Sequence, residues 1–258
     1  MLLACDAGNS NIVLGVWRKE SLLATFRLHT RHEMTADEFI ILVSSLLEKE
    51  LPTNQGFYGA VISSVVPPLT PELVRAVGEI TQVEPMVVAP GIKTGLNILY
   101  DDPREVGSDR IVNSVAGISL VEPPLIVLDF GTATTFDVIT PPNNYIGGAI
   151  CAGLAISMDA LAERTAKLPR VDLSPPECVV GKTTTDSIRS GIIIGHTEMV
   201  DGMVERIEKE KGIKCKVIAT GGYAEIIAKA SRRIERVEPN LTLLGLRLIW
   251  EMNSKSYA

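Results

Sequence analysis

The first 28 residues show the hydrophobic pattern of short strands joined by tight turns. Apolar runs at 2–6, 11–18 and 21–28 are separated by "AGNS" and "RKES", whose residues favour hairpin turns. The three runs predict an antiparallel meander.

The period then changes to that of a helix. Residues 35–51 carry apolar side chains at helical spacing, and Thr35 with Glu38 gives the pattern of a capping box at the N-terminus. A buried strand is predicted at 59–66, a helix from about Thr70, and another strand in "EPMVVA".

The second half repeats this order of elements. Strands are predicted at 125–130, 134–139 and 145–150, followed by a helix at 153–164 and a polar, Pro-containing loop at 167–179. The predicted second half ends with a long helix from Thr184 or Thr185 to about Lys211, a strand at 216–220, a helix in "GGYAEIIAKAS" and a terminal helix in "TLLGLRLIWEMN".

Each half therefore has the order βββ-α-β-α, which predicts an α/β protein made of two duplicated domains, residues 1–118 and 119–258. Each domain is expected to hold a mixed sheet, with ligands in the cleft between the two copies. The pattern leaves open whether the terminal helix packs on the first or the second half.

Composition narrows the function classes. With 258 residues, 46% of them hydrophobic, and a net charge of −6, the chain can form two cores but has no basic cluster for a nucleic acid or an anionic membrane. It lacks a signal peptide and an apolar stretch of about 20 residues, which indicates a cytoplasmic protein without a membrane partner. The four cysteines are scattered and predict free thiols. No nucleophile elbow, P-loop or dinucleotide-binding glycine motif is found.

One short phrase occurs at the same place in both halves. "LLACDAGNSNIVLGV" and "VLDFGTATTFDV" each read apolar strand, aspartate, any residue, glycine, then hydroxyl or amide residues. Gly8 allows close approach of a ligand and can supply a positive φ, and neighbouring N–H groups can donate to phosphate oxygens. Asp6 can hold a hydrated Mg²⁺. A single such phrase is usually just a hairpin turn, whereas two copies in matching positions favour phosphate binding from both domains.

Two further segments carry candidate chemistry. In "IATGGYAEIIAKA", Gly221 and Gly222 follow a strand and open a helix, which suits a nucleoside but also a plain turn. In "YDDPREVGSDRIVNSV", Asp109 near a helix start is a candidate proton acceptor, and Arg110 can bind a carboxylate. Alternatively, Asp109 stabilises the helix dipole and Arg110 forms a surface pair.

Taken together, "DAGNSN", "YDDPREVGSDR", "LDFGTATTFD", "GGAICAGL" and "ATGG" resemble the type III pantothenate kinases of the acetate kinase, sugar kinase, Hsp70 and actin superfamily. The resemblance implies duplicated ribonuclease-H-like (actin-like ATPase) domains, each with a mixed five-stranded sheet flanked by helices. It also implies ATP-dependent phosphorylation of the primary hydroxyl of pantothenate to 4'-phosphopantothenate, the first step of coenzyme A biosynthesis.

Carried over by position, the resemblance implies a role for each matching residue. Asp109 is the proton acceptor, Asp129 a ligand of a monovalent cation (K⁺ or NH₄⁺), and Asp6 a holder of Mg²⁺ through water. The residues implied to contact pantothenate are Tyr100, Gly107, Ser108, Asp109, Arg110 and Thr184. The residues implied to contact ATP are Asp6, Ala7, Gly8, Asn9, Ser10, Asn11, Ile12, Val13, Thr132, Gly221 and Gly222. A homodimer is implied as well.

The sequence departs from the common family pattern at Ser10, Ser108 and Ala152, and none of these changes removes a functional group. Two other functions stay open: a related small-molecule kinase of the same superfamily, and a nucleotide-binding transcriptional accessory factor of the same fold.

Overall fold

The computed structural model describes residues 1–51 and 56–254, which form two compact units. The first unit takes its described residues from Met1–Leu96, Asp101–Ala116 and the chain from Leu241 onward, and the second consists of Asn97–Tyr100 and Gly117–Asn240. The chain therefore returns to the first unit after it has completed the second. Among the described helices, none has the length and apolar content that a membrane crossing requires.

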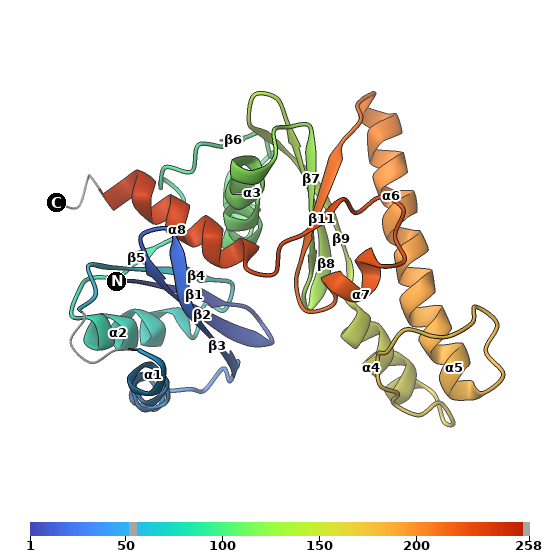
Figure 1. The fold of residues 1–258 in the computed structure, drawn as a ribbon, viewed down its shortest axis with the longest axis horizontal. Helices are drawn as coiled ribbons and strands as arrows, with labels where there is room; N and C mark the ends of the chain where they lie inside the picture. The colour runs from blue at the N-terminus through green and yellow to red at the C-terminus, as the bar shows by residue number, and fades with distance from the viewer. Residues whose placement is uncertain (52–55, 255–258) are drawn as a thin grey trace. The chain divides into compact units, whose positions relative to one another are not determined.

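The first unit is built on a five-stranded sheet in the order β3-β2-β1-β4-β5 (Figure 1). The first three strands form the predicted antiparallel meander, and β4 and β5 continue the sheet in parallel. Their bounds are β1 Leu2–Ala7, β2 Asn11–Arg18, β3 Ser21–His29, β4 Gly59–Ser64 and β5 Met86–Val87.

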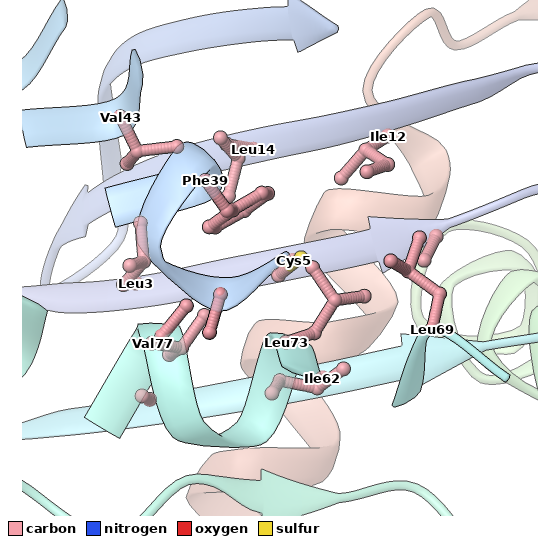
Figure 2. Packing of buried hydrophobic residues seen from close by; sticks show 14 of the residues in the cluster. Leu3, Cys5, Ile12, Leu14, Phe39, Val43, Ile62, Leu69, Leu73 and Val77 are labelled. Carbon is pink, nitrogen blue, oxygen red and sulfur yellow. The ribbon is translucent and has the colours of Figure 1, made fainter. Parts of the chain in front are cut away.

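Helices cover both faces of this sheet because alternate residues of β1 are apolar on both sides. Leu3 and Cys5 pack with α1 (Ala36–Glu50) and α2 (Thr70–Thr81), as Figure 2 shows for Phe39, Leu73 and Val77. On the other face, Leu2 and Ala4 lie in a second cluster with residues of α3 (Ser108–Leu120) and α8 (Leu241–Ser254). The terminal helix thus belongs to the core of the first unit.

The second unit holds a six-stranded sheet in the order β11-β10-β7-β8-β9-β6. A meander of β7 to β9 is joined on one side by the parallel strands β10 and β11 and on the other by β6. The strands are β6 Asn97–Ile98, β7 Leu125–Phe130, β8 Ala133–Thr140, β9 Asn144–Ala152, β10 Lys216–Thr220 and β11 Arg236–Val237, and the helices are α4 Leu154–Arg164, α5 Thr184–Arg189, α6 Gly195–Lys211 and α7 Ala224–Ala228.

The two units repeat the same strand register around their leading aspartates. Asp6 in β1 stands beside Ser63 of the parallel strand β4, and Asp129 in β7 stands beside Thr220 of the parallel strand β10. The burial patterns of β1 and β7 are identical residue by residue. The two units therefore share the same strand pairing around these aspartates, as the duplication in the sequence predicts.

Most predicted elements are confirmed, and the capping box of Thr35 and Glu38 is present in full. Three features differ from the expectation. The second sheet has a sixth strand, β6, which comes from the segment between the halves. The long helix predicted to end near Lys211 contains a π-helical segment, Ser190–Ile194, between α5 and α6. A short 3₁₀ turn, Pro103–Glu105, precedes α3.

Gly245 allows α8 to approach α3 closely, because a Cβ atom there would overlap the carbonyl oxygen of Val112. Substitution Gly245→Ala is expected to lower the free energy of unfolding by about 1–3 kcal/mol, the usual range for overpacking a core. Urea denaturation of wild type and variant measures the change.

The matched control is Gly202→Ala in α6, where an added Cβ meets no atom within 4 Å. This change should stabilise the protein by about 0.5–1 kcal/mol, because alanine is the better helix former. Equal effects of the two substitutions would contradict the close approach of α8 and α3.

Candidate active site

The first hairpin turn, between β1 and β2, is fixed by hydrogen bonds from a distant residue. The Gly8 N–H donates to the carbonyl of Asn11 at 3.0 Å. Thr30, which follows β3, donates its hydroxyl to the Gly8 carbonyl at 2.6 Å and its N–H to the Ser10 carbonyl at 3.1 Å. Asn9 and Ser10 are exposed at the tip. The turn is thus held in place while its polar tip remains accessible to an anion.

The start of α3 is attached to the strand next to Asp6. The hydroxyls of Ser108 and Ser63 lie 3.0 Å apart, and the Ser108 hydroxyl donates to the carbonyl of Ser64 at 3.3 Å. Because Ser63 is the register partner of Asp6, the first turn of α3 lies at the same end of the sheet as the first hairpin. The structure therefore brings the Asp6 segment and the Gly107–Arg110 segment together within one unit.

Asp109 lies in the first turn of α3 and folds back over Gly107. Its Oδ1 accepts the N–H of Arg110 at 2.8 Å, and a Cβ at Gly107 would lie only 2.5 Å from that oxygen. Burial raises the pKa of Asp109, although the Arg110 N–H and the Arg110 charge oppose the shift. A raised pKa makes this carboxylate a better proton acceptor. Arg110 is only 7% exposed, which excludes a surface pair.

In the second unit, the glycine turn after β10 packs directly on Asp129. A Cβ at Gly221 would lie 2.6 Å from Oδ1 of Asp129 and 2.6 Å from the carbonyl of Phe130. Gly221 also has a φ of +95°, whereas Gly8, for which the sequence allowed a positive φ, does not use one. The structure thus brings together Asp129 and Gly221, which the sequence analysis placed in separate motifs.

Thr132 belongs to the same group through the start of α4. Its carbonyl accepts the N–H of Gly153 at 3.2 Å, and the Gly131 N–H donates to the carbonyl of Ala133 at 3.1 Å. A side chain at Gly153 would collide with this carbonyl. The second hairpin is therefore fixed by close backbone contacts.

A buried histidine contacts this hairpin through a hydrogen bond. His196 in α6 is 9% exposed, and its Nε2 lies 2.9 Å from the hydroxyl of Thr134, a residue of the hairpin that is fully buried. Sequence analysis gave His196 no role, since a lone histidine in a helix carries no motif. The sequence analysis also gave no role to Thr30 and Ser63, since a lone hydroxyl residue carries no motif.

Two predicted substrate residues lie outside these groups. Tyr100 follows β6 at the edge of the second sheet, where its ring lies 6.5 Å from that of Tyr145. Thr184 is exposed in the first turn of α5. It lines a cavity of about 620 Å³ with Lys182, Thr183 and Ile192. The role of each in substrate binding stays a prediction.

Comparison with known families decides the assignment. The family model of type III pantothenate kinase matches residues 2–206, which include both hairpins, the Asp109 segment and Thr184. The chain belongs to the type III pantothenate kinase family.

Similar solved structures give the fold of this family member. A protein assigned to the Baf family of transcriptional activators from Campylobacter jejuni is 20% identical, with 98% of this chain and 99% of that chain covered and a TM-score of 0.59. A protein assigned as a 2-dehydro-3-deoxygalactonokinase from Sinorhizobium meliloti is 13% identical (98% and 99% covered, TM-score 0.58). The activator of 2-hydroxyisocaproyl-CoA dehydratase from Clostridium difficile, with bound ADPNP, is 11% identical (99% and 96% covered, TM-score 0.54).

These likenesses show an α/β fold of two ribonuclease-H-like domains, as in the actin-like ATPases. Membership of the family and the kinase fold together indicate an ATP-dependent kinase that uses a divalent metal ion.

Two aspartates of the site offer oxygen donors for hard metal ions. Asp6 is a half-buried carboxylate at a strand end, and carboxylate oxygens with waters suit Mg²⁺. Asp129 lies against Gly221, and its Oδ1 and the Phe130 carbonyl oxygen are each 2.6 Å from where a Gly221 Cβ would be. Carboxylate and carbonyl oxygens are the donors that hard cations take.

Burial lowers the pKa of His196 below its ordinary value, and this predicts a pH dependence of stability. The unfolded chain takes up the proton near pH 6.5, whereas the folded chain takes it up only at lower pH. The free energy of unfolding should therefore decrease as the pH falls from 7 through 6.5 toward the lowered pKa. Urea denaturation at pH 8, 7, 6 and 5 measures it.

The variant His196→Gln removes the titration and should reduce the loss of stability at low pH. His32→Gln, at an exposed position, serves as the control and should behave as the wild type. An unchanged pH profile in His196→Gln would show that this imidazole is not the group responsible.

Proposed function

We propose that this chain transfers the γ-phosphoryl group of ATP to the primary hydroxyl of pantothenate and releases ADP and 4'-phosphopantothenate. The observation that carries the proposal is the environment of Asp109. Its carboxylate lies at the start of α3, beside the sheet end that bears the first hairpin, and burial raises its pKa. A proton acceptor next to a phosphate-binding turn is the arrangement that phosphorylation of an alcohol needs.

In this reaction the Asp109 carboxylate accepts the hydroxyl proton as the hydroxyl oxygen attacks the γ-phosphorus, and the bond to the β,γ-bridging oxygen breaks. The buried guanidinium of Arg110 supplies positive charge for the pantothenate carboxylate. We assign Tyr100, Gly107, Ser108 and Thr184 to the same substrate.

The ATP phosphates are assigned to the hairpin segment of residues 6–13 and to Thr132, and the nucleoside to Gly221 and Gly222. Asp6 would hold Mg²⁺ through water and Asp129 would hold K⁺ or NH₄⁺, and these ions would supply positive charge next to the phosphates. The fixed turns contribute positioning, because their backbone donors need not reorganise during the reaction. A cytoplasmic homodimer without a nucleic acid partner completes the proposal.

Asp109→Asn is expected to lower kcat about 10²- to 10⁴-fold, the usual contribution of a general base, while the Kd for ATP changes little. Coupled ADP release with pantothenate as acceptor measures kcat, and calorimetry measures nucleotide binding. In the wild type, kcat/KM should decrease as the pH falls below the raised pKa of Asp109.

The control is Glu105→Gln, which removes an exposed carboxylate from the same loop and should leave kcat unchanged. If Asp109→Asn retains the wild-type kcat, Asp109 is not the proton acceptor.

The cation assignment predicts that pantothenate-dependent ATP consumption is faster with K⁺ than with Na⁺ as the sole monovalent cation. Asp129→Asn should reduce this difference, because it removes the negative charge of the proposed ligand. Equal rates with both cations in the wild type would contradict the assignment.

The same assay separates pantothenate from other acceptors. Glycerol, acetate and hexoses test the other kinases of the superfamily, and ATP binding without turnover of any acceptor would favour a nucleotide-binding accessory factor. Likeness to the Campylobacter protein, at 20% identity, bears on the fold alone.

A further inference from the structure

Tyr100 is attached to the edge of the second sheet by backbone hydrogen bonds. The N–H of Asn97 donates to the Asn143 carbonyl at 2.9 Å, and the N–H of Leu99 donates to the Tyr145 carbonyl at 2.8 Å. The segment before Tyr100 is therefore held parallel to β9 as the strand β6. This pairing fixes the position of the backbone next to Tyr100. The pairing by itself does not fix the orientation of the Tyr100 ring.

The ring of Tyr100 is placed by two residues of β9. It lies 6.5 Å from the ring of Tyr145 with an interplanar angle of 46°, a favourable tilted arrangement. Its Cε2 and Cδ2 also lie against Gly147, where a Cβ would come within 3.3 and 3.5 Å. Gly147 has a φ of +102° inside a strand. Glycine is thus required at this position both for its backbone conformation and for the room it leaves to Tyr100.

Tyr145 is itself held by a buried carboxylate. Its hydroxyl donates to Oδ1 of Asp137 at 2.8 Å, and both side chains are fully buried. Oδ2 of Asp137 accepts the hydroxyl of Thr135 at 3.3 Å, and Thr135 is the register partner of Asp129. A buried carboxylate requires such partners, because burying a charge without them is unfavourable.

We propose that Asp137, Tyr145 and Gly147 are positioning residues that hold the ring of Tyr100 in the orientation in which it binds the acceptor substrate. The hydrogen bond to Asp137 fixes the ring of Tyr145, and the ring of Tyr100 lies against the ring of Tyr145 and against Gly147. The functional part of this inference rests on the proposed function, since Tyr100 is a substrate contact only if the chain phosphorylates pantothenate.

Gly147→Ala tests the proposal, because the added methyl group would lie 3.3 Å from Cε2 of Tyr100, which is close enough to shift the ring by a few tenths of an ångström. The KM for pantothenate should rise about tenfold, within the coupling range of residues in contact, whereas the KM for ATP should stay unchanged. Gly91→Ala is the matched control: Gly91 has a φ of +100° but meets no atom within 4 Å. It reproduces the backbone strain without touching Tyr100 and should leave both KM values unchanged.

Two further variants test the chain of contacts. Tyr145→Phe removes the hydroxyl but keeps the ring, and it should raise the KM for pantothenate more than the KM for ATP. In a Tyr100→Ala background, Gly147→Ala should cause no further rise, because no ring remains to be displaced. Additive effects in that double variant, or equal rises of both KM values, would overturn the proposal.

A measurement without substrate separates this inference from the proposed function. The chain has 5 tyrosines, so fluorotyrosine labelling gives few ¹⁹F resonances, and Tyr100→Phe identifies that of Tyr100. Gly147→Ala and Tyr145→Phe should shift this resonance, and Gly91→Ala should not. If wild type fails to phosphorylate pantothenate but the shifts occur, the proposed function fails while the positioning of Tyr100 stands. An unshifted resonance overturns the positioning.

Discussion

The parallel pairing of β1 with β4, and of β7 with β10, is the constraint on which the candidate site depends. In a parallel pair both strands end at the same edge of the sheet. Asp6 therefore ends beside Ser63, which anchors the first turn of α3 and with it Asp109, and Asp129 ends beside Thr220, which leads into Gly221. Segments more than 50 residues apart in the sequence meet in each unit because the register brings them together.

Local patterns were sufficient to predict most of the fold. The meanders, the helix at Thr35 with its capping box and the strand at 216–220 all follow from periodicity and turn residues, which act within a few positions. The two-residue strands β5, β6 and β11 exist only because a neighbouring strand offers hydrogen bonds. The sequence predicted just one of them, since such pairing leaves little trace in local composition.

The same distinction applies to the site. The sequence revealed the aspartates and glycines of the hairpins because they recur in two copies, and Asp109 because it stands near the start of a helix. Thr30, Ser63 and His196 escaped recognition, because a hydroxyl or an imidazole gains its role from a partner brought near by the fold. The sequence analysis allowed Gly8 a positive φ, whereas the structure has a positive φ at Gly221. The sequence of a turn does not show which of its glycines has a positive φ.

The return of α8 to the first unit has a consequence for the order in which the protein matures on the ribosome. Leu243, Leu246 and Ile249 complete the face of the sheet formed by Leu2, Ala4 and Val61, so this face is incompletely covered until α8 emerges. All residues of the second unit are synthesised before that point. Domains generally fold in the order of synthesis, but here the unit that begins first is completed last. The nascent chain therefore carries an incompletely covered apolar face in its first unit while the whole second unit is being made.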